Sequence, residues 1–326
     1  MRLAGLLGAA LAALVPAAAG AGEARPFIVY HESWFERPAT GAVATTLAWL
    51  PPYASTVVLS FAKPDLVYPG GLDISGTGLE YQFPGSVLHD AVARLKHENP
   101  ETKVLLGIGG DSYKGGWPAF DVAATAKLVK DLGADGIDLD YEPPNPGCER
   151  GADGRIACAS DPIWRDLVRR IRAELPRPYV LTIPVWSVGA YGEGEFAASQ
   201  PVSGYTGVML DLLRSPEAAE VDALSIMSYE AGPHYDPAEA FRAYRTLWKG
   251  PLAIGINVIS TIPGDDWSVP RIEALLPRLA TPEDPQAGAM LYAVLEHPAD
   301  GSADGRAKLK AICRVLGLEG CAQGLP

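Results

Sequence analysis

Short apolar runs rich in β-branched residues recur along the chain and are separated by longer segments of mixed polarity. Hydrophobicity within a run is mostly continuous rather than alternating, which is typical of strands buried on both faces of a parallel sheet. Eight runs predict strands, at residues 26–31 (PFIVYH), 56–62 (TVVLSFA), 103–109 (KVLLGIG), 136–142 (GIDLDYE), 179–185 (YVLTIPV), 223–229 (ALSIMSY), 252–258 (LAIGINV) and 289–295 (AMLYAVL).

Amphipathic stretches lie between several of these runs and predict helices at residues 86–99, 121–132, 162–175 and 237–248. Strands that alternate with helices indicate βαβ units. Eight such units in about 300 residues fit a single α/β domain, a (β/α)8 TIM barrel. The gap between the seventh and eighth strands is about thirty residues, which leaves no room for a large insertion there.

An open doubly wound sheet is the structural alternative, and it usually carries a glycine-rich phosphate loop. Gly107, Gly109 and Gly110 resemble the start of such a loop, but Ser112 stands where GxGxxG needs its last glycine. The sequence GxxxxGK[ST] is also missing from the chain. Tight packing at a strand end explains these glycines better than phosphate binding.

The first 24 residues differ from the rest of the chain. A positive start at Met1 and Arg2 precedes an apolar run at 3–15, and small residues follow through Ala24. This order is typical of a secretory signal peptide, with cleavage after Ala21 or Ala24. A membrane anchor would need roughly 20 apolar residues. We therefore expect a signal peptide at 1–24, one domain at 25–326, and a secreted or periplasmic protein not bound to membrane.

The chain is acidic, with a formal net charge of −12 and no basic run. Nucleic-acid binding needs clustered Lys and Arg to contact phosphates, so this class of partner is not expected. A neutral polymer such as a polysaccharide remains compatible with the charge, and a monomer is expected.

The four cysteines are grouped in two close pairs. Cys148 and Cys158 lie ten residues apart, and Cys313 and Cys321 lie eight apart. In an oxidising compartment two local disulfides are the simplest interpretation. A zinc site is the alternative, but neither a CxxC spacing nor a nearby histidine supports it.

Three acids alternate with large residues on the fourth predicted strand: Asp138, Asp140 and Glu142. Residues two apart on a strand project to the same face, so all three acids face one way. Close buried carboxylates cannot all ionise easily, and at least one pKa should rise. A glutamate kept protonated in this way can act as a general acid. An exposed acidic strand face and a metal-binding row are the alternatives; the flanking apolar residues oppose the first, and the lack of a histidine opposes the second.

Residues 135–142, DGIDLDYE, match the whole DGxDxDxE signature of the family 18 glycoside hydrolases, which comprise chitinases and endo-β-N-acetylglucosaminidases. The chain resembles this family along nearly its whole length after the N-terminal segment. YHESW at 30–34 is similar to the first-strand opening of many chitinases. LSIMSYE resembles the sixth-strand MxYD motif, with Met227 and Tyr229 matching.

The chain departs from the family pattern at three positions. Gly107 replaces the serine of the third-strand SxGG motif, and Glu230 replaces the aspartate of MxYD. In GAMLY, which resembles the last-strand GxMxW, Tyr292 stands where the sugar-stacking tryptophan is usual. These departures weaken the specific expectation of a chitinase more than the general expectation of a glycosidase.

The resemblance implies a substrate-assisted retaining mechanism, in which the acetamido group of the substrate is the nucleophile. Glu142 would be the proton donor, Asp140 would hold the acetamido N–H, and Asp138 would support Asp140. Tyr229 would donate a hydrogen bond to the acetamido oxygen. Neither a metal nor an organic cofactor is implied, and residues 25–326 would form the catalytic domain.

Substrate contacts are expected from aromatic residues at predicted strand ends and from residues of the family motifs. Among the tryptophans, Trp34, Trp117, Trp186 and Trp267 are candidate sugar platforms, with Trp186 favoured by its place at a strand end. Met227 considered alone is more often a core residue. The expected substrate-binding set is Tyr292, Trp186, Met227, Glu230, Tyr30 and Trp34.

The expected substrate is a glycan containing N-acetylglucosamine, cleaved at β-1,4 bonds. Two other functions stay open. A non-catalytic chitinase-like lectin would keep the barrel, although the retention of Glu142 opposes it. The same chemistry could also act on N-linked oligosaccharides or peptidoglycan, because the loops rather than the acids choose the polymer.

Overall fold

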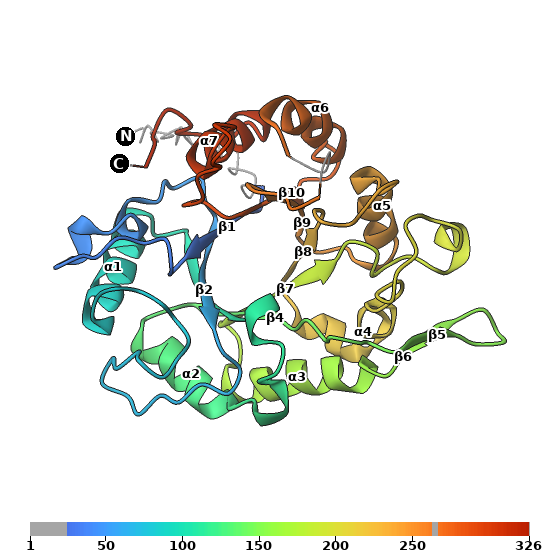
Figure 1. Ribbon diagram of the computed structural model, residues 1–326, viewed down its shortest axis with the longest axis horizontal. Coiled ribbons are helices and arrows are strands. Elements are labelled where there is room, and N and C mark those ends of the chain that lie inside the picture. The colour runs from blue at the N-terminus through green and yellow to red at the C-terminus, as the bar shows by residue number, and fades with distance from the viewer. Residues whose placement is uncertain (1–24, 263–266, 326) are drawn as a thin grey trace, which may run out of the picture.

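The computed structural model describes residues 25–262 and 267–325, and its central feature is a closed ring of parallel strands (Figure 1). In the described chain eight strands close the barrel in the order β1-β10-β9-β8-β7-β4-β3-β2. The predicted (β/α)8 barrel without a large insertion before the last strand is therefore confirmed. The predicted signal peptide lies outside the described residues.

The barrel strands coincide with the eight predicted runs. Four of them end earlier than expected: those over 136–142 and 223–229 by two residues, that over 289–295 by three and that over 252–258 by one. Glu142 and Tyr229 therefore lie two residues beyond a strand end rather than within a strand. In the run over 136–142, Pro143 and Pro144 come directly after Glu142, and proline cannot donate a hydrogen bond to a neighbouring strand. The strands are β1 (Phe27–Glu32), β2 (Thr56–Ala62), β3 (Lys103–Gly109), β4 (Gly136–Asp140), β7 (Val180–Trp186), β8 (Ala223–Met227), β9 (Leu252–Asn257) and β10 (Ala287–Tyr292).

Helices surround the ring on its outer side (Figure 1). The four predicted helices are present as α1 (Gly85–Glu98), α2 (Val122–Asp131), α3 (Asp161–Glu174) and α5 (Pro237–Leu247). The structure adds α4 (Leu210–Arg214), α6 (Val269–Leu279) and α7 (Gly305–Val315). In place of a first α-helix, two short 3-10 helices, Ala42–Ala44 and Leu47–Trp49, follow β1.

Several helices begin at an aspartate that caps them. The side chain of Asp121 accepts a hydrogen bond from the Ala124 N–H at the start of α2. Asp304 accepts from the Ala307 N–H in the same way at the start of α7. Such caps satisfy N–H groups that the first helical turn leaves without an intrahelical partner. They fix where the chain leaves the barrel loops and enters the outer layer.

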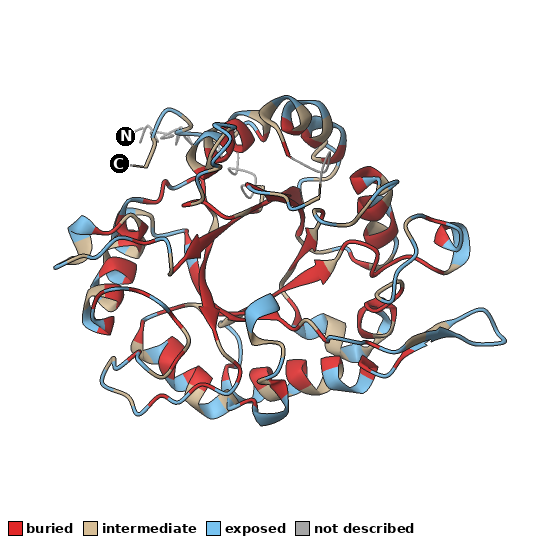
Figure 2. Cartoon of the chain, viewed as in Figure 1, coloured by how far each residue is buried: buried red, intermediate tan, exposed pale blue. Residues whose placement is uncertain are grey.

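Alternation along the strands creates two cores, one inside the barrel and one between barrel and helices. Figure 2 shows the strands as buried and the surrounding helices as exposed on their outer faces. Ile137, Leu139 and Tyr141 belong to the outer core, so Asp138 and Asp140, on the opposite face of β4, point into the barrel. The inner core contains Ile28, Tyr30, Val58, Phe61, Leu105, Ala253, Met290 and Ala293.

A small antiparallel hairpin interrupts the βα alternation after β4. It consists of β5 (Cys148–Arg150) and β6 (Ile156–Cys158) and projects away from the barrel (Figure 1). The disulfide Cys148–Cys158 closes its base, and Cys313–Cys321 joins the end of α7 to the following turn. Both predicted local disulfides are confirmed. Among the described helices, none is long and apolar enough to cross a membrane.

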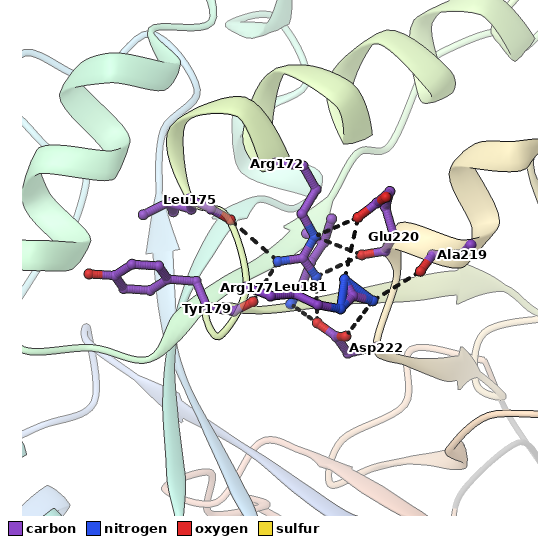
Figure 3. Close-up of polar contacts among 8 residues, drawn as sticks. All are labelled: Arg172, Leu175, Arg177, Tyr179, Leu181, Ala219, Glu220 and Asp222. Carbon is purple, nitrogen blue, oxygen red and sulfur yellow. Dashed lines mark hydrogen bonds and ion pairs between the residues drawn. The ribbon is translucent and has the colours of Figure 1, made fainter.

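A buried arginine ties together the N-terminal ends of β7 and β8 (Figure 3). Arg172 of α3 donates to the carbonyl oxygen of Glu220 through Nε at 2.8 Å and through Nη2 at 2.7 Å. Its Nη1 donates to the carbonyls of Leu175 and Tyr179, and its guanidinium pairs with Asp222. This cluster lies at the barrel end opposite the carboxyl ends of the strands.

Candidate active site

Asp138 is fully buried inside the barrel and is held from both sides. Tyr30 Oη of β1 donates to its Oδ2 at 2.6 Å, and Thr182 Oγ1 of β7 donates to its Oδ1. Burial raises the pKa of Asp138 to about 6, although the two hydroxyl groups lower it. The side chain is therefore fixed in one orientation, with both oxygens satisfied.

The missing serine at position 107 has a steric explanation in this barrel. Gly107 lies opposite Asp138 in the β3–β4 ladder, and Thr182 lies opposite Asp138 in the β4–β7 ladder. A Cβ at Gly107 would lie 2.9 Å from Val58 Cγ1 and 3.1 Å from a ring carbon of Phe61. A serine there would displace these inner-core side chains, whereas Thr182 supplies a hydroxyl group from the other neighbouring strand. Sequence reasoning missed Thr182.

Asp140 is almost completely buried and has a free acceptor. Its side chain is held by no hydrogen bond comparable to those of Asp138, and its Oδ1 is buried without a partner among the described residues. Burial, followed by the charges of Glu142 and Asp138, raises its pKa well above the usual range. An unsatisfied buried carboxyl is costly, and this one lies where a ligand could pair with it.

Glu142 stands at the mouth of the barrel with 12% of its side chain exposed. Burial raises its pKa to about 7, while the ammonium of Lys114, 3.8 Å away, lowers it and Asp111 raises it. A neutral carboxylic acid is therefore available near pH 7. The row thus contains one fixed carboxyl, one with a free acceptor, and one reachable acid.

A cavity of about 390 Å³ opens above this row, at the carboxyl ends of the strands. In a (β/α)8 barrel this is the end where active sites form. Trp34 lines a second cavity, of about 360 Å³, which shares Phe61, Asp111 and Tyr292 with the first. Apart from the buried Asp138, the structure brings the other predicted site residues together in the first cavity: Tyr30, Asp140, Glu142, Trp186, Met227, Tyr229, Glu230 and Tyr292.

Aromatic rings follow one another from the first cavity into the second, and we call Tyr229, Tyr292, Phe61, Trp34 and Phe35 the aromatic path. Successive ring centroids are 5.9, 6.4, 6.4 and 6.0 Å apart. Concave sites lined by aromatic rings with a few placed polar groups are typical of small-molecule and sugar binding. Sequence reasoning missed Phe61 and Phe35 because neither lies in a recognised motif.

Two of the four candidate tryptophans are core residues instead of sugar platforms. Trp267 is fully buried, and its Nε1 donates to the carbonyl of Ser228 at 2.9 Å. Trp117 is buried against Tyr141, with ring centroids 5.1 Å apart. Trp186, by contrast, lines the cavity and stacks on Tyr205 at 3.6 Å.

Glu230 lines the cavity but its carboxylate is turned towards a neighbouring loop. Its Oε1 accepts hydrogen bonds from Thr261 N at 3.1 Å and from Thr261 Oγ1 at 2.9 Å. The backbone of Glu230 has φ of +52°, a conformation that non-glycine residues adopt uncommonly. Its contacts join two loops at the rim of the cavity.

A larger hollow of about 680 Å³ lies outside the barrel, beside the β5–β6 hairpin. Its lining includes ion-paired side chains, Arg165 with Asp211 and Arg214 with Glu193. None of the predicted site residues lines it. Among the described residues, no group of three or more His, Cys, Asp or Glu side chains is arranged to hold a metal ion.

Known proteins resemble this chain in sequence. The model of the family described as Glycosyl hydrolases family 18 matches residues 27–249. A protein of Plasmodium falciparum (isolate 3D7) named Chitinase is 38% identical over 127 residues, which cover 35% of this chain and 31% of that protein. Chitinase 63 of Streptomyces plicatus is 29% identical over 147 residues, which cover 42% of this chain and 23% of that protein. The matches span less than a third of either relative.

The fold has solved counterparts as well. A family GH18 chitinase from Chromobacterium violaceum is similar with a TM-score of 0.60 at 14% identity, over 90% of this chain and 83% of that one. At this identity the likeness concerns the fold. The family match is independent of it and covers most of the barrel, from β1 to just beyond α5. The chain therefore belongs to family 18 of the glycosyl hydrolases.

Proposed function

We propose that the protein is a chitinase-like glycosidase that hydrolyses β-1,4 bonds of N-acetylglucosamine-containing glycans by substrate-assisted retaining catalysis. One observation carries the proposal: Glu142 has a pKa raised to about 7 and faces an aromatic-lined cavity together with a buried Asp140 that has a free acceptor. The geometry supplies an acid and a partner for a substrate N–H in one place.

In the first half-reaction Glu142 gives its proton to the glycosidic oxygen while the bond from C1 to that oxygen breaks. The acetamido carbonyl oxygen of the same sugar forms a bond to C1, which gives an oxazolinium-type intermediate. Asp140 accepts a hydrogen bond from the acetamido N–H and stabilises the positive charge that develops. Tyr229, which lines the same cavity, donates to the acetamido oxygen.

In the second half-reaction water attacks C1 and the bond to the acetamido oxygen breaks. Glu142, now a carboxylate, takes the proton of the water and returns to its starting state. Two inversions at C1 give net retention. Asp138 stays in place throughout, because Tyr30 and Thr182 fix both of its oxygens, and it limits where Asp140 can turn.

The substrate class follows from the lining of the cavities. Four residues of the aromatic path, Tyr229, Tyr292, Phe61 and Trp34, line the two cavities and supply apolar surface for several sugar units in sequence. Trp186 and Met227 complete the lining near Glu142. A linear glycan of N-acetylglucosamine fits this arrangement, and the acetamido group is required by the mechanism.

The proposal extends to location and state. The two disulfides and the N-terminal apolar run at 3–15 are in keeping with a secreted or periplasmic protein that loses residues 1–24. Residues 25–326 then act as one catalytic domain, without a cofactor and as a monomer. Its partner is the glycan.

The test is hydrolysis of oligomers of N-acetylglucosamine, N-glycosylated protein and peptidoglycan, followed by reducing-sugar release and by NMR of the first anomer formed. We expect cleavage of the oligomers with retention. Glu142→Gln should reduce kcat by about 10²–10⁴-fold, because the acid can no longer donate. The matched control is Glu296→Gln: burial also raises the pKa of Glu296 to about 7, but that residue lies outside the cavity lining.

Two outcomes would contradict the proposal. Full activity of Glu142→Gln would show that Glu142 is not the proton donor. Binding of the oligomers by the wild type without any cleavage would favour the lectin alternative, which the departures at Gly107, Glu230 and Tyr292 leave open. Cleavage of glycoprotein or peptidoglycan alone would keep the chemistry and change the substrate.

A further inference from the structure

Two oppositely charged side chains, Asp111 and Lys114, line the same cavity as Glu142. They belong to the loop after β3, whereas Glu142 follows β4. The two strands are paired up to Gly109 and Asp140, so this loop begins beside the acid. It therefore brings a charge pair to the acid from a neighbouring strand.

Lys114 contacts both carboxylates. Its Nζ forms an ion pair with Asp111 Oδ1 and lies 3.8 Å from Glu142 Oε2. The exposed fractions of the side chains are 84% for Asp111, 30% for Lys114 and 12% for Glu142. Charges sheltered from water are screened less than exposed ones. Lys114 therefore acts more strongly on Glu142 than the distance would give in open solvent.

Groups from several other elements also face Glu142. Burial raises the pKa of each tyrosine among them above its usual value, so these remain neutral at the pH values of interest. Asp140 acts as a like charge when ionised. The groups are Asp140 on β4, Tyr205 in the loop after β7, Tyr229 after β8 and Tyr292 at the end of β10. Lys114 is the cation in contact with Glu142, and its own pKa is raised above the usual lysine value.

We propose that Lys114 and Asp111 are positioning residues of the reaction, with Lys114 supporting the carboxylate of Glu142 after it has donated its proton and Asp111 holding Lys114 short of full contact. The proposal rests on the proposed hydrolytic function and adds two residues that the sequence motifs do not contain.

The reaction cycle explains why such a divided arrangement is useful. Glu142 must be neutral before the first step and negative between the two steps. A cation in full contact would remove the proton from the resting acid. No cation at all would leave a sheltered carboxylate without compensation, which is costly. An ammonium shared between Asp111 and Glu142 supports both states.

The first experiment measures the pH dependence of kcat/KM on the neutral tetramer of N-acetylglucosamine. Activity needs protonated Glu142, so it is lost as the pH rises through the pKa of that group. Lys114→Met removes the charge that lowers this pKa. The alkaline limb should therefore move up, by on the order of 1 pH unit.

Asp111→Asn should move the alkaline limb in the opposite direction and by a smaller amount, because it frees Lys114 to approach Glu142. Lys114→Arg keeps the charge, so the alkaline limb of its pH profile should lie where that of the wild type does. Lys103→Met is the matched control. Lys103 is the exposed first residue of β3, at the other end of the same strand, so its loss should leave the profile unmoved.

The second experiment reads the ionisation of Glu142 without turnover. NMR titration of protein labelled with ¹³C at the glutamate carboxyl carbons gives the pKa, and the signal is assigned by its loss in Glu142→Gln. The same two shifts of opposite sign are expected in Lys114→Met and Asp111→Asn.

The outcomes separate this proposal from the proposed function. An inactive wild type would overturn the function, while the NMR titration would still judge the charge pair. An active wild type with unmoved limbs and an unmoved NMR titration in both variants would overturn the charge pair alone. A raised KM with unmoved limbs would also overturn it, because Lys114 would then be a sugar contact.

Discussion

The two ends of the barrel treat buried charge in opposite ways. At the N-terminal ends of β7 and β8, Arg172 is surrounded by carbonyl oxygens and paired with Asp222 (Figure 3). At the carboxyl end of β4, by contrast, three acids follow one another at intervals of two residues, and Lys114, the nearest cation among the described residues, is 3.8 Å from Glu142. At the first end the buried charge has its partners within the protein. At the second end the buried Asp140 Oδ1 has no partner among the described residues.

The difference follows from what each end must do. A buried charge that is fully hydrogen-bonded holds elements in place, and removing one partner is strongly destabilising. A carboxyl that lacks a partner is an energetic cost that a substrate can relieve. In this fold the lower end is associated with stability and the upper end with chemistry. Each variant below removes a charged or hydrogen-bonding group at one of the two ends, and its effects on stability and on kcat are compared.

Replacing Arg172 should have the largest effect on stability. Arg172→Met removes the buried cation of Asp222, which keeps only the half-exposed Arg177, and leaves several carbonyl oxygens without a donor. The free energy of unfolding should therefore fall by about 3 kcal/mol. Urea unfolding measures this. The kcat of the folded protein should not change. Arg172→Lys keeps the charge but loses the planar guanidinium, so its free energy of unfolding should lie between those of the wild type and Arg172→Met. Equal stability of Arg172→Met and wild type would break the comparison.

The same isosteric change at each end should give opposite results. Asp140→Asn should reduce kcat about 100-fold, with oligomer binding kept and the free energy of unfolding unchanged or raised, because it removes a like charge from the row. Asp222→Asn should instead lower that free energy by about 1–3 kcal/mol and leave kcat unchanged. Steady-state kinetics and urea unfolding of both proteins decide this, and matching effects of the two variants would contradict it.

The smallest effect is expected at Thr182 of β7, which donates a hydrogen bond to Asp138, the one acid of the row whose two oxygens are both satisfied. Thr182→Val removes the hydroxyl group from Asp138 at nearly constant volume. Loss of one hydrogen bond costs about 1 kcal/mol, so kcat should fall several-fold and at most about tenfold. Thr182→Ser keeps the hydroxyl group and should retain most of the rate. Equal rates in the valine and serine variants would show that Asp138 needs no donor from β7.

The sequence predicts the barrel well because its signals are local. Continuous apolar runs identify the eight strands. In the DGIDLDYE segment the acids stand at every second residue, which places them on one face of a strand. Prolines at 143 and 144 shorten the fourth strand, which places Glu142 on a loop. Helix α6 was not predicted because Pro277 lies inside it and Pro270 in its first turn, residues that usually mark helix ends.

Contacts between strands were not predictable in the same way. Thr182 and Gly107 are separated by many residues, and only the strand order places them on either side of Asp138. Lys114 approaches Glu142 because two loops meet at the barrel mouth. The tryptophans show the same limit: Trp267 and Trp186 look equivalent in the sequence, yet one is fully buried and the other lines the cavity.

The β5–β6 hairpin carries an exposed surface that lies apart from the candidate active site. It begins six residues after Glu142, and the Cys148–Cys158 bridge closes its base. Its exposed tip, residues 151–155, points away from the barrel (Figure 1). Because the bridge fixes both strands at the base, we expect changes in length or composition at the tip to leave Glu142 in place. This tip is therefore a tolerant attachment point, where a label, a surface tether or an additional sugar-binding module could be joined without disturbing the barrel mouth.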